Sequence, residues 1–141
     1  WEWGGTTSIE VYVKYDSFNR YSRVFDFGNG PSIDNVDLLN HETTSTIGWQ
    51  VLQGSGRHTQ KVVYGEKAIS SVWTHVVVTV SGTTMKVYKN GVLTGTRTDG
   101  HEPNILIRTQ HWLGRSSWNT GYFDGTIAYV KMWHGVELQQ S

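Results

Sequence analysis

The stretch that decides the fold is WTHVVVTV at residues 73–80, followed after a short break by TMKVYK at residues 84–89. Valine occupies every second position from 76 to 80, and this period of two predicts a β-strand with one buried row. Asn90-Gly91 follows the second segment and is the dipeptide most typical of a tight type I′ hairpin turn. We therefore expect residues 84–89 to pair with a strand at 92–96.

The same alternation recurs along the rest of the chain. Ile9, Val11 and Val13 fall on one face of a predicted strand, and polar residues fall on the other. Further short strands are predicted at 23–27, 35–40, 46–53, 60–64, 105–108, 111–114 and 125–133. About ten short strands with no helical period between them predict an all-β, antiparallel sandwich or barrel.

The composition supports an all-β class and excludes several functions. Valine and threonine occur 16 times each against two alanines, which favours strands over helices. Twelve basic and twelve acidic residues cancel, so no basic surface for nucleic acid is expected. No run approaches the ~20 apolar residues of a membrane span. The absence of cysteine excludes disulfides, a thiolate zinc site and a cysteine nucleophile.

The length predicts one domain over residues 1–141, because domains usually hold about 100–200 residues. The sequence begins at Trp1, with neither an initiator methionine nor a signal peptide. We therefore expect a domain that was excised from a larger protein.

Three segments together resemble laminin G-like domains of the concanavalin A-like lectin/glucanase superfamily. Trp73–Val80 with Lys86–Gly91 is similar to the core "W-x-H-V, then L-Y-x-N-G" of these domains. Ser8–Lys14 is similar to their opening strand, and Leu113–Ser116 with Phe123–Ile127 is similar to their closing segment. The resemblance covers nearly the whole chain in the right order. It implies a concanavalin A-like jelly roll, in which two curved antiparallel sheets pack face to face.

The resemblance leaves function open, because this fold carries lectins, adhesion modules, glycoside hydrolases and lyases. A retaining glycosidase needs two carboxylates about 5–5.5 Å apart, which on this scaffold means acidic residues spaced by two along one strand. The sequence contains no Glu-x-Asp pattern of this kind. We therefore expect no catalytic residues and no enzymatic activity.

One loop-rich segment mixes aromatic and hydrogen-bonding side chains, as a sugar site requires, because sugars stack their CH faces on aromatic rings and bond through their hydroxyls. Trp118 lies on an apparent loop and is the best candidate for exposure, whereas Trp112 could equally be a core residue. Trp49 and Trp73 lie in strong strand patterns and are expected in the core. The predicted ligand-binding residues are His111, Trp112, Arg115, Trp118, Asn119 and Tyr122.

The resemblance also implies one possible cofactor, a calcium ion at the rim of the sandwich. Asp34 follows Phe27-Gly28 as the family's calcium-binding aspartate does, and Asp99 with Asn104 would complete the site beside backbone carbonyls at 52–54. An Asx-turn at Asp34 on an exposed edge is the alternative.

Asp26 lies between two phenylalanines, so that alternation places it on the opposite face from both rings. If that face is buried, the carboxylate needs a partner. Arg115 is the candidate, and the ion pair would join an early strand to a late one.

These observations favour a non-catalytic, lectin-like domain of a larger surface or secreted protein, with a glycan or glycoconjugate as its partner. We expect it outside the cell or on the surface of a cell or virion. The alternative is a structural or protein-adhesion module of an extracellular or virion-surface assembly, whose partner is another protein. The zero net charge of the chain favours an uncharged ligand. If the ligand is instead a polyanion, Arg108 and Arg115 are the candidate residues to contact it.

Overall fold

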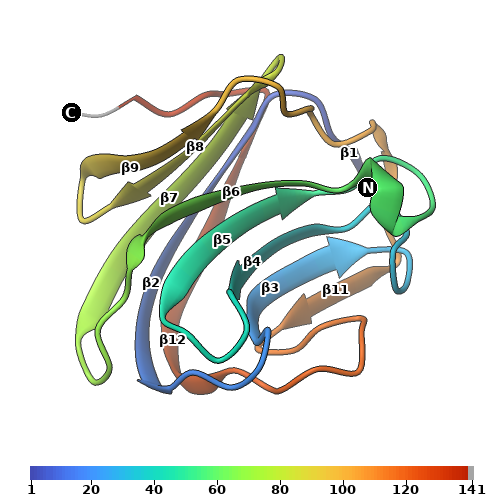
Figure 1. The fold of residues 1–141 in the computed structure, drawn as a ribbon. Helices are drawn as coiled ribbons and strands as arrows, with labels where there is room; N and C mark the ends of the chain where they lie inside the picture. Colours follow the sequence, from blue (N-terminus) through green and yellow to red (C-terminus); the bar gives the residue numbers. More distant parts are fainter. Residues whose placement is uncertain (140–141) are drawn as a thin grey trace.

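Two five-stranded antiparallel sheets face each other in the computed structural model, which describes residues 1–139 (Figure 1). Sheet I has the order β12 (Asp124–His134), β2 (Thr7–Ser17), β7 (Trp73–Ser81), β8 (Thr84–Lys89) and β9 (Val92–Arg97). Sheet II has the order β11 (Gln110–Leu113), β3 (Arg23–Gly28), β4 (Val36–Asn40), β5 (Thr46–Val51) and β6 (Lys61–Lys67). A short ribbon joins β1 (Glu2–Trp3) to β10 (Leu106–Ile107).

The predicted all-β, two-sheet sandwich is confirmed. The helical structure of residues 1–139 is a single 3₁₀ turn, η1 (Arg57–Thr59). No helix in this part of the chain is long and apolar enough to cross a membrane. Each strand expected from the period of two forms, and β1 is an addition that its two residues were too short to reveal.

The hairpin turn after β8 has the predicted geometry. Asn90 has φ 50° and Gly91 has φ 80°, so both central residues adopt the left-handed conformation that a type I′ turn requires. The turn directs β9 back along β8, with Lys89 opposite Val92. The Asn-Gly dipeptide therefore sets the register of the pairs next to the turn, before the register shifts between Tyr88 and Val87.

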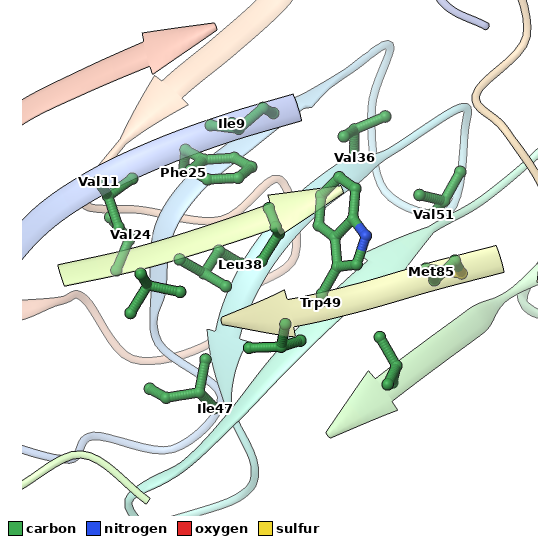
Figure 2. Packing of buried hydrophobic residues seen from close by; sticks show 14 of the residues in the cluster. Ile9, Val11, Val24, Phe25, Val36, Leu38, Ile47, Trp49, Val51 and Met85 are labelled. Atoms are coloured by element: carbon green, nitrogen blue, oxygen red, sulfur yellow. The ribbon is translucent and has the colours of Figure 1, made fainter. Parts of the chain in front are cut away.

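The core lies between the two sheets and is filled by the inward rows of β2, β3, β4, β5, β7 and β8 (Figure 2). Trp49 of β5 is fully buried, as its strand pattern predicts. Its indole Nε1 donates a hydrogen bond of 3.1 Å to the backbone oxygen of Thr79, in β7 of the opposite sheet. This contact satisfies the buried indole N–H and ties sheet II to sheet I.

The expectation that Trp73 lies in the core is wrong. Trp73 is 38% exposed on the outer face of sheet I, where its ring stacks on Tyr12 at 4.9 Å between centroids. Val76 and Val78 occupy the inward row of β7, and successive side chains of a strand point to opposite faces. Trp73 is an odd number of positions away from both, so it must point outward.

We expect Trp49→Phe to lower the free energy of unfolding by about 2–4 kcal/mol, because the smaller ring leaves a cavity and removes the hydrogen bond to Thr79. Trp1→Phe is the matched control: Trp1 is 71% exposed, and the change should stay within about 0.5 kcal/mol. Urea unfolding followed by circular dichroism measures both. Equal stabilities of the two variants would contradict the role given to Trp49.

Candidate functional site

The outer face of sheet II carries a row of polar side chains across neighbouring strands. Trp112 of β11 lies opposite Asp26 of β3, Asp26 opposite Asp37 of β4, and Asp37 opposite Gln50 of β5. The alternate residues of these strands fill the core, so this row must point away from it. Asp26 and Asp37 are nevertheless fully buried, which means that other parts of the chain cover this face.

The cover over Asp26 comes from two loops. Its Oδ2 accepts hydrogen bonds from the backbone N–H of Ser117 at 2.7 Å and from Ser116 Oγ at 3.3 Å. Its Oδ1 accepts one from Asn35 Nδ2 at 3.0 Å. Burial raises the pKa of Asp26, and these three donors and the charge of Arg23 oppose that rise. The β11–β12 loop, residues 114–123, is held against the sheet by this carboxylate.

The predicted ion pair between Asp26 and Arg115 is wrong. Arg115 is exposed, and its guanidinium lies over the ring of Trp112 at 4.2 Å and over that of Tyr122 at 6.0 Å. The donors that satisfy Asp26 are a backbone N–H, a hydroxyl and an amide, none of which a charge-based search of the sequence considers. Arg115 is therefore free to face solvent above an aromatic ring.

Asp37 lies beside Asp26 and has weaker support. Gln50 Nε2 donates to its Oδ2 at 3.0 Å, and Arg23 Nε lies 3.8 Å from its Oδ1, too far for a hydrogen bond. The pKa of Asp37 is raised to about 8, chiefly by burial; the charge of Arg23 opposes this rise, the charge of Asp26 adds to it, and the hydrogen bond from Gln50 opposes it. At neutral pH most Asp37 side chains therefore carry a proton, and the charge of Arg23 is only partly balanced.

Arg23 and Trp118 link this buried row to the surface. The Arg23 guanidinium lies 4.8 Å from the centre of the Trp118 ring, and its Nη1 donates to the Tyr21 backbone oxygen at 2.7 Å. Trp118 Nε1 donates to Ser32 Oγ at 3.2 Å. Trp118 is half-buried by these contacts, rather than exposed as its loop position suggested.

Two hollows adjoin this tryptophan. The larger one, the sheet hollow, has a volume of about 360 Å³, and the smaller one, the loop hollow, about 210 Å³. Trp118, Asn119 and Thr120 line both. The loop hollow is further lined by Arg115, Ser116, Ser117 and Tyr122, and the sheet hollow by Arg20, Tyr21, Arg23, Leu39, Gln50, Arg57, Gln60 and Tyr64.

A glycine allows the loop to come close enough to form these hollows. A Cβ on Gly121 would lie 2.7 Å from Asn19 Cβ and 3.2 Å from the backbone nitrogen of Arg20. Gly121 N–H instead donates to the Arg20 oxygen at 3.0 Å, and Asn19 Nδ2 donates to the Tyr122 oxygen at 2.9 Å. The β11–β12 loop and the β2–β3 connection therefore form one wall.

The structure brings together four of the six predicted ligand-binding residues: Arg115, Trp118, Asn119 and Tyr122 line the loop hollow. Trp112 lies beneath Arg115, with its Nε1 buried and without a hydrogen-bond partner among residues 1–139.

His111 is separated from this group, because alternation along β11 turns it toward the other face. There it accepts a hydrogen bond of 3.4 Å from Trp3 Nε1 and packs on Phe27. Burial and the charge of Arg108 lower the pKa of His111.

Sequence reasoning missed most of the sheet hollow. Arg20, Arg23 and Arg57 come from the β2–β3 connection, the first position of β3 and η1. Arg20 and Arg23 are neighbours along the chain, but nothing in the sequence indicates that Arg57 joins them. The two phenylalanines that flank Asp26 predict that its side chain points to the face opposite theirs. Its position opposite Asp37, however, depends on the pairing of β3 with β4.

The three residues predicted to bind calcium make other contacts in the structure. Asp34 Oδ1 already accepts hydrogen bonds from the Gly54 N–H at 2.7 Å and from Asn104 Nδ2 at 3.2 Å. Asp99 is bound to Arg97 at 2.8 Å, and the pKa of its carboxyl is lowered by that contact. Within residues 1–139 no three His, Asp or Glu side chains gather in a way that could hold a metal ion. Calcium binding stays a prediction from the sequence, which these contacts do not support.

Comparison with protein families adds one finding. Residues 2–140 match the family model Laminin_G_3, described as the concanavalin A-like lectin/glucanases superfamily. The chain belongs to this family. The resemblance read from the sequence is thereby confirmed, and the two-sheet sandwich of this laminin G-like domain is the fold that the family implies. Comparison with curated proteins finds no match.

Solved structures with the same fold include several domains that were determined with bound sugars. Domain 4 of AbnA, a GH43 extracellular arabinanase from Geobacillus stearothermophilus, in complex with arabinotriose, is 22% identical, with a TM-score of 0.67 over 94% of this chain and 62% of that one. The CBM40 of the Ruminococcus gnavus IT-sialidase, bound to α2,3-sialyllactose, is 17% identical, with a TM-score of 0.76 over 96% and 79%.

A third structure with this fold is the heptameric SAP-like pentraxin of Limulus polyphemus, which is 13% identical, with a TM-score of 0.65 over 94% of this chain and 65% of that one. The laminin G-like domain spans less than two thirds of the arabinanase and pentraxin chains. At these identities the likeness establishes the fold.

A thermal-stability measurement tests whether the domain binds calcium at the predicted residues. Because Asp34 and Asp99 already have partners, we expect millimolar calcium to leave the melting temperature unchanged relative to EDTA. Differential scanning fluorimetry checks this. A reproducible rise with calcium that is absent in Asp34→Asn would restore the site read from the sequence.

We expect Asp37→Asn to stabilise the domain at alkaline pH. The pKa of Asp37 rises from 3.8 to about 8 on folding, so the folded state holds its proton more tightly than the unfolded chain does. The contribution of Asp37 to the free energy of unfolding therefore has its maximum value below pH 4. That contribution falls by at most about 1.4 kcal/mol per pH unit as the pH approaches 8. Asparagine imitates the neutral form and does not titrate.

Urea unfolding at pH 5 and pH 8 measures this difference. The variant should exceed the wild type by about 1–3 kcal/mol at pH 8 and by much less at pH 5. Asp16→Asn, at an exposed position, is the control and should change stability by less than about 0.5 kcal/mol at both values. A less stable Asp37→Asn variant at pH 8 would contradict a neutral Asp37.

Proposed function

We propose that this laminin G-like domain is a non-catalytic carbohydrate-binding module that holds a glycan across the loop and sheet hollows. The observation that carries the proposal is that Trp118, Asn119 and Thr120 line both hollows. It places an aromatic face beside amide and hydroxyl groups, the combination that sugar recognition needs. Tyr122, which is 66% exposed, adds aromatic surface to the loop hollow, and Tyr64, which is 42% exposed, adds it to the sheet hollow.

The dimensions favour a short stretch of sugar chain. Small-molecule sites commonly have volumes of about 300–1,000 Å³, and the sheet hollow lies at the lower end of that range. The loop hollow, which Trp118 also lines, adds about 210 Å³. A few sugar residues lying over the tryptophan would occupy both, with Arg115 and Asn119 available for hydrogen bonds.

Two of the similar structures support this assignment. One is an arabinanase domain in complex with arabinotriose, and the other is a sialidase carbohydrate-binding module bound to sialyllactose. They show that this fold carries sugar-binding sites in other proteins. The particular residues that would contact sugar here rest on the geometry of the two hollows.

The position of the acidic residues supports a non-catalytic role. Asp26 and Asp37 lie opposite each other on adjacent strands, as a pair of catalytic carboxylates could. Both are fully buried, and neither lines the sheet hollow or the loop hollow. No other Asp or Glu of residues 1–139 lines these hollows. A general acid must reach the glycosidic oxygen, which these carboxylates do not.

A shallow glycan site of this kind suits a secreted or surface protein. Such sites bind weakly, and several copies on one parent protein raise the overall affinity through effective concentration. We therefore propose that the domain forms part of a larger extracellular or surface-exposed protein and delivers it to glycans or glycoconjugates.

The proposal predicts that Trp118→Ala and Tyr122→Ala each weaken glycan binding by at least about fivefold, because each removes a stacking surface. Trp1→Ala, which removes an exposed tryptophan at another place, is the control and should bind like the wild type. A glycan array followed by isothermal titration calorimetry measures the effect, and circular dichroism verifies folding. Unchanged binding in both site variants, or no array signal for the wild type, would overturn the proposal.

A further inference from the structure

The sheet hollow concentrates positive charge in a chain whose net charge is zero. Arg20, Arg23 and Arg57 line it, and no Asp or Glu of the described residues does. We propose that these three arginines bind the anionic group of an acidic sugar, a carboxylate or a sulfate, on the glycan that the module recognises. This inference rests on the proposed carbohydrate-binding function and names the class of sugar. It replaces the uncharged ligand expected from neutrality.

Arg23 supplies a fixed, incompletely paired guanidinium. Its side chain is only 7% exposed, and its position is held by the Tyr21 oxygen at 2.7 Å and by the ring of Trp118. Its Nε is buried and makes no hydrogen bond within residues 1–139. A guanidinium that is already oriented loses little freedom when it binds a planar or tetrahedral anion.

The carboxylates near Arg23 balance its charge only partly, because neither forms a hydrogen bond with it. Asp37 lies 3.8 Å from Arg23 Nε, and burial keeps that carboxyl mostly protonated at neutral pH. Asp26 accepts its hydrogen bonds from Ser116, Ser117 and Asn35, and it acts on Arg23 through its charge alone. A buried cation without a full counter-charge is unfavourable, so an arriving anion gains more here than at an ordinary surface arginine.

Arg20, from the β2–β3 connection, and Arg57, from η1, add two more positive charges to the lining of the hollow. Both are exposed, and neither forms an ion pair within residues 1–139. Arg20 lies over the Tyr21 ring at 5.6 Å, and Arg57 begins η1. Like charges gathered in a hollow raise the local concentration of anions and speed their arrival.

The rest of the lining indicates a sugar rather than a free inorganic anion. Tyr21, Tyr64 and Trp118 offer aromatic surface, and Gln60 and Asn119 offer amide groups that can bond hydroxyls. A phosphate or sulfate ion would use the arginines and leave these groups without partners. An acidic sugar uses both kinds of group at once.

Calorimetry with matched ligands tests the inference. The probes are lactose, 3′-sialyllactose and 3′-sulfolactose, which share one neutral core, and tetragalacturonate with its methyl ester. Sialyllactose and galacturonate report on a carboxylate, and sulfolactose reports on a sulfate. We expect at least one acidic probe to bind about tenfold or more tightly than its neutral counterpart, and higher salt to reduce the difference.

Variants at exposed positions keep the test independent of folding. Arg20→Gln and Arg57→Gln should each weaken the acidic probe about three- to tenfold and leave its neutral counterpart unchanged. Lys131→Gln removes an exposed positive charge from β12 of the opposite sheet and is the control, with no expected effect. Equal binding of acidic and neutral probes, insensitive to both arginine variants, would overturn the inference and leave the carbohydrate-binding function standing. If none of the five probes binds, the inference fails, and the glycan array then decides whether the proposed function fails with it.

Discussion

Asp26 holds the candidate site together. Its buried carboxylate accepts hydrogen bonds from Ser116, Ser117 and Asn35, and thereby fixes the β11–β12 loop on the outer face of sheet II. Once that loop is in place, Trp118 lies over Arg23 and lines both hollows. A sandwich of this kind would form its core without Asp26, because the core lies on the other face of the sheet.

This arrangement lowers the stability of the domain. Asp26 and Asp37 are buried opposite each other on adjacent strands, and burial raises the pKa of both. Removing two carboxylates from water is unfavourable unless hydrogen bonds compensate, and Asp37 Oδ1 has no hydrogen-bond partner within residues 1–139. The same burial leaves Arg23, which lines the sheet hollow, only partly neutralised. The instability of this row and the positive character of the site have one origin.

Much of the fold was predictable, because alternation is local and a strand's two faces can be read from neighbouring residues. The inward rows of β2 and β7, the buried Trp49 and the Asn90-Gly91 turn all follow from short stretches of sequence. Trp73 was wrongly expected in the core because it is aromatic, although its odd spacing from Val76 places its side chain on the outer face. The same parity separates His111 from Trp112 on β11.

The sequence by itself determined the class, the strands, the laminin G-like family and the loop that contributes Trp118, Asn119 and Tyr122. Only the tertiary structure decided which partners Asp26 has, that Asp37 lies opposite it, and that three arginines from separate elements share one hollow. Strand periodicity depends on neighbours along the chain, whereas these contacts depend on which strands pair, in which register, and which loops lie over them. Net charge, a sum over the whole chain, carries no information about how charges are distributed on its surface.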